Sequence, residues 1–176
     1  TMKQVEMIAP GRIVVKDIER PSPASGEVLV RVAICGICGS DVHAYLGEHP
    51  FITCPVVPGH EFSGVIVAIG AGVTEWQVGQ RVTVEPSLVC GSCYNCRQGR
   101  YNICENLRVI GCQAPGAMAE YLSVPAAKLV ALPKTMSFEE GALVEPAAVA
   151  VHAVARGGYP GGKKVIVMGA GTIGLL

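Results

Sequence analysis

Gly59-His-Glu-Phe-Ser-Gly-Val-Ile-Val-Ala-Ile-Gly70 lies near the middle of the chain and combines a strand pattern with metal-binding side chains. Residues 64–69 are small or β-branched and end at a glycine, a pattern that predicts a short β-strand. Another apolar run follows at residues 81–84. His60 and Glu61 stand directly before the first of these runs, and both side-chain types bind zinc in proteins.

Similar short runs with the pattern of β-strands occur on both sides of this stretch. They cover residues 4–8, 12–17 and 27–34 before it, and residues 119–124 and 128–132 after it. Turn-forming residues separate them, as in Pro21-Ser-Pro-Ala-Ser-Gly26. This spacing predicts an antiparallel, partly barrel-like β domain.

Two helices are expected after the last strand. Ser137-Phe-Glu-Glu140 has the S-x-x-E pattern of a capping box, which opens a helix. Pro146 should end or kink that helix and begin a second one that runs to about Ala155. Glu145 is therefore expected at a bend.

The last twenty residues have a different pattern. Residues 157–162 have the composition of a linker. The apolar, β-branched sequence at residues 164–168 predicts a buried strand. Gly169, Gly171 and Gly174 then form Gly-x-Gly-x-x-Gly, the phosphate-binding pattern of dinucleotide domains when it joins a strand to a helix. We expect residues 1–156 to form one domain and residues 157–176 to be the truncated beginning of a Rossmann-type domain, with the acidic residue that reads the ribose beyond Leu176.

The composition indicates which binding partners and which cellular compartment to expect. Fourteen basic residues balance fourteen acidic ones among 176 residues, and no basic block is present, so a nucleic-acid or membrane partner is not expected. The most apolar stretch, residues 141–155, is interrupted by Glu145 and His152 and is no membrane span. Eight cysteines without a secretory signal indicate metal binding in a reducing compartment, so we expect a cytoplasmic protein.

The strongest chemical signal is the cysteine run 90-x2-93-x2-96-x7-104. Four thiolates at this spacing can surround one Zn²⁺ with Zn–S distances of about 2.3 Å. An iron–sulfur cluster or unligated thiols are the alternatives, although the bacterial ferredoxin run closes with a shorter spacing and a proline. Because all four positions would be filled by Cys90, Cys93, Cys96 and Cys104, such a zinc would stabilise the loop without doing chemistry.

A second set of ligand types is scattered along the chain. Cys38, His60 and Glu61 could hold a zinc through three protein groups and leave a fourth position for a water or a substrate oxygen. Taken one by one, Cys38 could equally be a core thiol and His60 a loop histidine. A Cys35–Cys38 redox pair is a further alternative, but no thioredoxin-like context surrounds it.

Together these motifs resemble the zinc-dependent medium-chain alcohol dehydrogenase family. The pattern Gly59-His60-Glu61-x2-Gly64-x5-Gly70 is similar to its zinc signature, and residues 72–82 resemble the segment that follows it. The four-cysteine run and the terminal glycine motif come next in the family's order. The resemblance covers nearly the whole chain and implies a mixed α/β protein, with a GroES-like, partly open β-barrel as catalytic domain.

The resemblance also implies roles for single residues. Cys38, His60 and Glu61 are similar to the catalytic zinc ligands of the sorbitol and threonine dehydrogenase branch. Ser40 and His43 resemble its proton relay, in which a hydroxyl passes a proton to an imidazole that releases it to water.

Two further carboxyl groups belong to this implied site. Asp41 would hydrogen-bond the ligating histidine, or would simply cap a local helix. Glu145 stands where the branch has Glu-Pro and would contact the substrate or zinc as an outer-sphere or direct ligand; an exposed glutamate near a helix start is the alternative. One departure concerns sorbitol, because Ala44 follows His43 where sorbitol dehydrogenases carry a substrate-binding tyrosine.

The implied activity is hydride transfer between a secondary alcohol or polyol and NAD or NADP in a full-length enzyme, a homodimer or homotetramer with two zinc ions per chain. The 176-residue chain alone is expected to be inactive. A stand-alone zinc-binding interaction module and a zinc-free quinone reductase relative are the alternatives, and the second is disfavoured by Cys38, His60 and Glu61.

Overall fold

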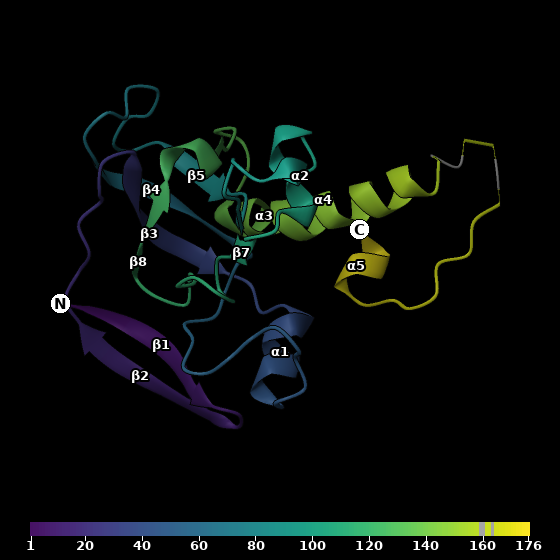
Figure 1. Ribbon diagram of the computed structural model, residues 1–176, viewed down its shortest axis with the longest axis horizontal. Coiled ribbons are helices and arrows are strands. Elements are labelled where there is room, and N and C mark those ends of the chain that lie inside the picture. The colour runs from purple at the N-terminus through teal and green to yellow at the C-terminus, as the bar shows by residue number, and fades with distance from the viewer. Residues whose placement is uncertain (159–160, 163) are drawn as a thin grey trace.

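The computed structural model describes residues 1–158, 161–162 and 164–176. A five-stranded antiparallel sheet in the order β8-β3-β4-β5-β9 forms its centre (Figure 1). These strands span Tyr121–Pro125 (β8), Glu27–Cys35 (β3), Phe62–Ile69 (β4), Arg81–Val84 (β5) and Leu129–Ala131 (β9). Two smaller antiparallel pairs accompany it, β1 (Met2–Ala9) with β2 (Arg12–Ile18) and β6 (Ser87–Leu88) with β7 (Arg108–Val109).

The chain also forms several short helices and one longer helix. The short ones are α1 (Gly39–Tyr45), α2 (Tyr94–Arg97), α3 (Phe138–Ala142), α5 (Thr172–Leu175) and the 3₁₀ turns η1 (Tyr101–Ile103) and η2 (Ala126–Lys128). The longer helix, α4 (Val144–Arg156), points away from the sheet, and α5 lies beside it (Figure 1). Among the residues that the structure describes, no helix has both the length and the apolar character needed to cross a bilayer.

The central strands bury one shared core. Val28, Val30, Phe62, Ile66 and Val82 are almost completely buried in it, as the alternation of apolar residues along these strands requires. The pairing of β3 with β4 shifts register twice, between residues 29 and 30 and between residues 32 and 34. Such irregularities bend a sheet, which agrees with the expected partly barrel-like domain.

The glycines of the central motif are needed for close packing. A Cβ at Gly64 would overlap the backbone carbonyl of Arg31 on the neighbouring strand, and one at Gly70 would overlap that of Ala24. Both glycines therefore let backbone segments approach more closely than any other residue would permit. This spacing places the strand that follows Glu61 directly against β3, which leads to Cys38.

The predicted ends of the elements are largely confirmed. All seven strands predicted before residue 133 form, and only the two-residue strands β6 and β7 were not predicted. Ser137 caps α3 as expected, since Glu140 donates its backbone N–H to the Ser137 hydroxyl at 3.1 Å and accepts from Ser137 N at 2.6 Å. Leu143 joins α3 to α4, and Pro146 lies in the first turn of α4.

The strand predicted near the end of the chain is not formed. Residues 164–168 form no strand, and the side chains of Ile166 and Met168 are 88% and 93% exposed. A parallel strand is stabilised by hydrogen-bonded neighbours and by helices on both faces of its sheet, and the described residues supply neither. The described part of the chain consequently shows a mixed α/β GroES-like domain and no Rossmann fold.

Candidate metal centres

The four-cysteine cluster lies in the loop between β6 and β7. Cys93 caps α2, Cys96 lies within it, and Cys104 follows η1. The four sulfur atoms lie within 4.8 Å of one another. Backbone N–H groups of Cys93 and Cys96 donate to the preceding cysteine sulfurs, Cys90 Sγ and Cys93 Sγ, at 3.4 Å each. The short helical turns thus bring the thiols together and direct amide dipoles at them.

The electrostatics of this cluster favour negatively charged sulfur. Hydrogen bonds from the backbone of Ser92 and Cys93 lower the pKa of Cys90 to about 5, and backbone donors at Glu105 and Cys96 lower the pKa of Cys93. Burial instead raises the pKa of Cys96 to about 12. Partly ionised thiols at this spacing suit a tetrahedral zinc, which would also take the proton's place on the more basic thiol.

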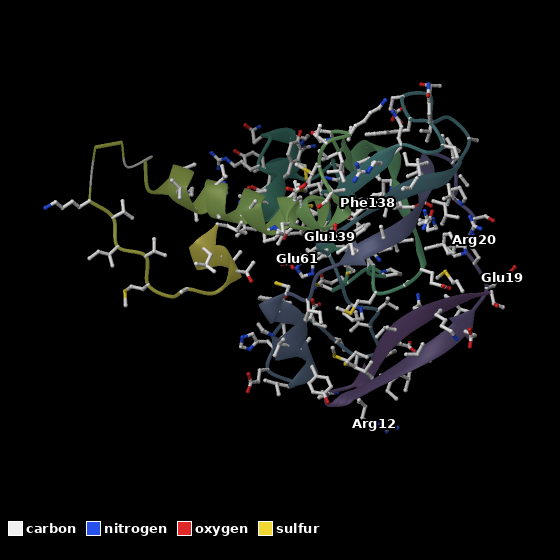
Figure 2. All side chains as sticks on the ribbon, turned by 180° about the vertical axis from the view of Figure 1, so that it is seen from behind. Arg12, Glu19, Arg20, Glu61, Phe138 and Glu139 are labelled. Atoms are coloured by element: carbon white, nitrogen blue, oxygen red, sulfur yellow. The ribbon has the colours of Figure 1, made fainter. Side chains whose placement is uncertain are left out.

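The second cluster brings together the three scattered residues. Cys38 is the N-cap of α1, while His60 and Glu61 immediately precede β4. One ligand atom of each lies within 4.8 Å of the others. Glu61 lies between the central sheet and α1 (Figure 2), and the side chains of His60 and Glu61 are both buried.

A polar atom in this cluster lacks a partner. His60 Nδ1 is buried and makes no hydrogen bond with any residue that the structure describes. A side-chain hydrogen bond with Cys38 raises the pKa of His60, and the same bond lowers the pKa of the Cys38 thiol. Thiolate, imidazole and carboxylate groups are the ligands that zinc binds, and an unpaired buried nitrogen is costly without an ion or another partner. The residues present therefore fit a three-ligand zinc site with an open position.

A cavity of about 750 Å³ opens next to this cluster. Ser40, His60 and Glu145 line it, so the three predicted site residues from α1, the β4 entrance and α4 meet here. Burial raises the pKa of the Glu145 carboxyl, with nearby Glu61 adding to the effect and His60 opposing it. Glu145 lies outside the three-residue ligand cluster, which favours contact with a substrate or an outer-sphere position over direct ligation.

The α1 residues differ in their placement. Ser40 hydrogen-bonds Cys38 and is partly buried, whereas His43 faces solvent and its Nδ1 lies 3.2 Å from Glu48 Oε2. Asp41 Oδ2 accepts from the backbone N–H of Cys38 at 2.9 Å, which is the helix-capping alternative. The expected hydrogen bond from Asp41 to His60 is not formed, because Asp41 Oδ1 and His60 Nδ1 both lack a partner. Asp41 acts on His60 only through its charge, which raises the histidine's pKa.

Sequence reasoning missed most of the cavity wall. Cys112 and His49, which belong to none of the motifs in the sequence, both line it. The other lining residues not singled out are Phe51, Pro86, Ser87, Leu107, Val109 and Gln113. They come from three separate segments of the chain, two of which include the short strands β6 and β7, and no spacing in the sequence marks them as neighbours.

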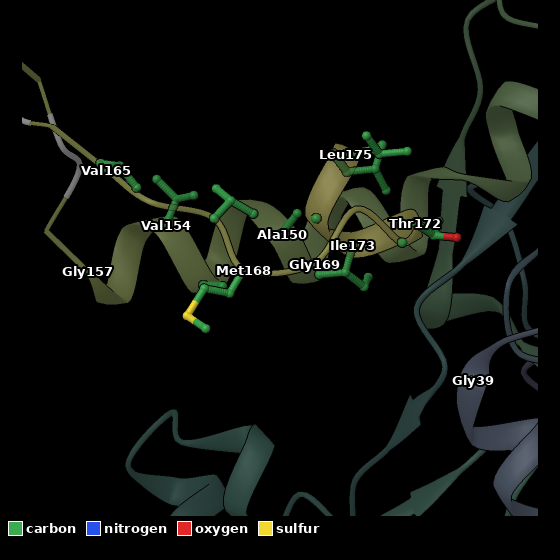
Figure 3. A pocket seen from close by; sticks show the side chains of 15 residues that line it. Gly39, Ala150, Val154, Gly157, Val165, Met168, Gly169, Thr172, Ile173 and Leu175 are labelled. Carbon is green, nitrogen blue, oxygen red and sulfur yellow. The ribbon is translucent and has the colours of Figure 1, made fainter.

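The terminal glycine motif lies beside a different cavity of about 1000 Å³ (Figure 3). This cavity is bounded by α4, by residues 165–176 and by Gly39 at the start of α1, and Gly169, Gly171 and Gly174 line it together with Ala150 and Val154. A Cβ at Gly174 would overlap the Gly169 carbonyl, so the turn is as tight as the motif predicts. The turn is therefore present, although the strand before it is not formed.

Comparison with known proteins shows the family of the chain that carries these two clusters. Residues 24–134 match the family model of the alcohol dehydrogenase GroES-like domain. The chain belongs to the zinc-type medium-chain alcohol dehydrogenase family. Within that family it is the N-terminal, GroES-like portion and is like the polyol and threonine dehydrogenases.

Individual relatives show which proteins the chain resembles. It is 43% identical to the (R,R)-butanediol dehydrogenase of Bacillus subtilis strain 168, over 92% of this chain and 49% of that protein. It is 39% identical to an uncharacterized zinc-type alcohol dehydrogenase-like protein of Haemophilus influenzae, over 99% of this chain and 52% of that protein. The chain thus spans about half the length of the curated relatives it matches.

A solved structure adds a cofactor to the comparison. A short chain alcohol dehydrogenase (rspB) from Escherichia coli CFT073, complexed with NADH, superposes with a TM-score of 0.83 at 40% identity. The match covers 89% of this chain and 46% of that one. Other relatives are named as dehydrogenases of L-galactonate and of (R,R)-butanediol, and a second solved structure, a putative zinc-binding dehydrogenase from Sinorhizobium meliloti 1021, is bound to NADP.

Proposed function

We propose that this chain supplies the catalytic half of a zinc-dependent dehydrogenase that transfers a hydride between a secondary alcohol or polyol and NAD(P). The observation that carries the proposal is the convergence of Cys38, His60 and Glu61 beside a cavity lined by Ser40 and Glu145. Three protein ligands with room for a fourth are typical of catalytic zinc. Cys90, Cys93, Cys96 and Cys104 would hold a second, structural zinc with all positions filled.

The chemistry divides between the bound groups and the chain's own residues. When bound, zinc acts as a Lewis acid on the substrate oxygen and NAD(P) carries the hydride. Ser40 lies at the ligand cluster and would accept the alcohol proton while it gives up its own hydroxyl proton. His43, three residues later on α1, passes that proton to solvent, since its side chain is exposed. Glu145 accepts a hydrogen bond from a second substrate hydroxyl.

The proposed substrates are vicinal diols and polyols. Glu145 offers a hydrogen-bond acceptor within the cavity that a primary alcohol without a second hydroxyl would leave unused. Sorbitol itself is not favoured. Ala44 is buried against Met7 and Val56, and neither Ala44 nor Tyr45 lines the cavity.

The proposed cofactor site and assembly extend beyond this chain. Gly169, Gly171 and Gly174 would approach the pyrophosphate of NAD or NADP through the tight turn that they form. A homodimer or homotetramer is proposed for the full-length enzyme.

Metal analysis and enzyme assay together test the function. We expect two zinc ions in the wild-type chain. Cys90→Ser should lose one ion and unfold more easily, because the four-cysteine site holds a long loop together. His60→Ala should lose the other ion and keep its fold. In a full-length protein containing this segment, His60→Ala should abolish alcohol oxidation.

Other outcomes would point elsewhere. One zinc in the wild type, or iron bound at the four cysteines, would contradict the assignment of the sites. Two zinc ions without dehydrogenase activity in the full-length protein would instead favour a zinc-binding interaction module.

A further inference from the structure

Gly36 lies beside the carboxylate of the three-residue cluster. It follows the last residue of β3 and precedes Cys38 by two positions. Its backbone N–H donates to the backbone carbonyl of Glu61 at 2.6 Å. This bond continues the pairing of β3 with β4, in which Cys35 stands opposite Phe62. Gly36 and Glu61 are therefore held face to face by the sheet itself.

The space at Gly36 is occupied by the Glu61 side chain. A Cβ at position 36 would lie 2.6 Å from Glu61 Oε2 and 3.2 Å from Glu61 Cβ. Gly36 does not belong to the glycines with positive φ, so its backbone conformation is open to other residues. Glycine is needed here for room and not for backbone freedom.

Gly39 provides a direct contrast three residues later. It also lacks a positive φ, and a Cβ at Gly39 would meet no atom within 4 Å. The two glycines flank Cys38 in the same Cys-Gly-Ile-Cys-Gly stretch. A methyl group is therefore free of contacts on one side of the thiol and collides with the Glu61 carboxylate on the other.

We propose that Gly36 is a positioning residue, whose missing side chain leaves the space in which the Glu61 carboxylate reaches Cys38 and His60. This inference rests on the proposed zinc site. The closest contact of a methyl group at position 36 is Glu61 Oε2, the far end of a flexible side chain, whereas Glu61 Cβ at 3.2 Å and the Glu61 carbonyl oxygen at 3.4 Å need only small shifts. The carboxylate therefore moves and the backbone stays. The fold then loses little, but the metal cluster loses an oxygen ligand.

The test compares Gly36→Ala with the matched control Gly39→Ala in the complete 176-residue chain. Metal affinity is measured by chelator competition with Co²⁺, whose spectrum separates the four-thiolate site from the site with a single thiolate. Gly36→Ala should weaken Co²⁺ binding at the single-thiolate site by about 10- to 100-fold, the usual effect of disturbing groups that orient a ligand. Gly39→Ala should bind as the wild type does, and the four-thiolate site should be unchanged in both variants.

A double mutant shows whether Glu61 carries the effect. In a Glu61→Ala background, adding Gly36→Ala should cost no further affinity, because the displaced group is already gone. If the loss persists in that background, or if Gly36→Ala binds metal normally, the inference is overturned. If Gly36→Ala fails to fold, the double mutant decides: recovery of the fold supports the contact with Glu61, and continued unfolding rejects it. A wild-type chain with no metal at the single-thiolate site would contradict the proposed function instead.

Discussion

Two groups of interactions shift the pKa of the buried His60 side chain in opposite directions. The hydrogen bond with Cys38 and the charge of Asp41 raise its pKa, while burial lowers it. The bond to Cys38 has the largest effect, and it raises the pKa of His60 while it lowers the pKa of the Cys38 thiol. A zinc ion would replace the shared proton, and metal binding should therefore release protons and strengthen as pH rises.

His43 is the residue whose proposed role pH can test. Replacing it with alanine in a full-length protein containing this segment should slow alcohol oxidation by up to about 10²-fold, the low end for a positioned base. The slowing should be greatest below neutral pH, where hydroxide is scarce as an alternative proton acceptor. Steady-state pH profiles with and without imidazole buffer would show the loss and its partial rescue. An unchanged profile would mean that the proton leaves by another route.

At the scale of elements, the cavity wall depends on contacts between loops. Gln113 Nε2 donates to the backbone carbonyl of Phe51 at 2.8 Å, and its Oε1 accepts from Val109 N at 3.0 Å. The backbone carbonyl of Gln113 also accepts a hydrogen bond from the Arg108 guanidinium at 3.0 Å. A single side chain thus ties the loop before β4 to the turn after β7, and both segments line the cavity.

Gln113→Met should loosen this tie with little change in side-chain volume. We expect the free energy of unfolding to fall by about 1 kcal/mol, since two hydrogen bonds are lost and each contributes about 0.5 kcal/mol at an exposed site. Urea unfolding of the metal-loaded chain would measure the change. Gln98→Met is the control, because only the backbone of that exposed glutamine makes hydrogen bonds. Equal destabilisation in both variants would contradict a special role for Gln113.

At the scale of the whole molecule, both metal clusters are joined to the cavity through the domain, whereas the glycine turn has few contacts with the rest of the chain. The β6–β7 pair links the four-cysteine loop to the cavity, because Ser87 and Val109 are paired and both line it. The terminal segment meets the rest of the chain mainly where α5 contacts α4, and residues 165–168 are exposed. A dinucleotide binds across a crevice between two halves of a parallel sheet, which the described residues do not form.

The 176-residue chain should therefore bind neither NADH nor NADPH measurably, even with both zinc sites filled. Isothermal titration of the zinc-loaded chain with each cofactor would check this, with an alcohol oxidation assay beside it. Micromolar affinity or turnover would show that the terminal turn and α4 suffice for the cofactor.

Local patterns in the sequence predicted the elements and the ligand types. Alternating apolar residues, the Ser137 capping box and the cysteine spacing act over a few neighbouring residues, so their structural consequences follow from short stretches of chain. The resemblance to a family then identified Cys38, His60 and Glu61 as one group, which no local spacing could have done.

Tertiary structure alone decided the features that depend on distant partners. Phe51 and Gln113 meet across 62 positions, and Gly36 faces Glu61 because two strands pair between them. The segment 164–168 has a strong strand pattern and still forms no strand. Its backbone hydrogen bonds would have to come from neighbouring strands of another sheet, and a sequence pattern records the preference of a segment without supplying its partners.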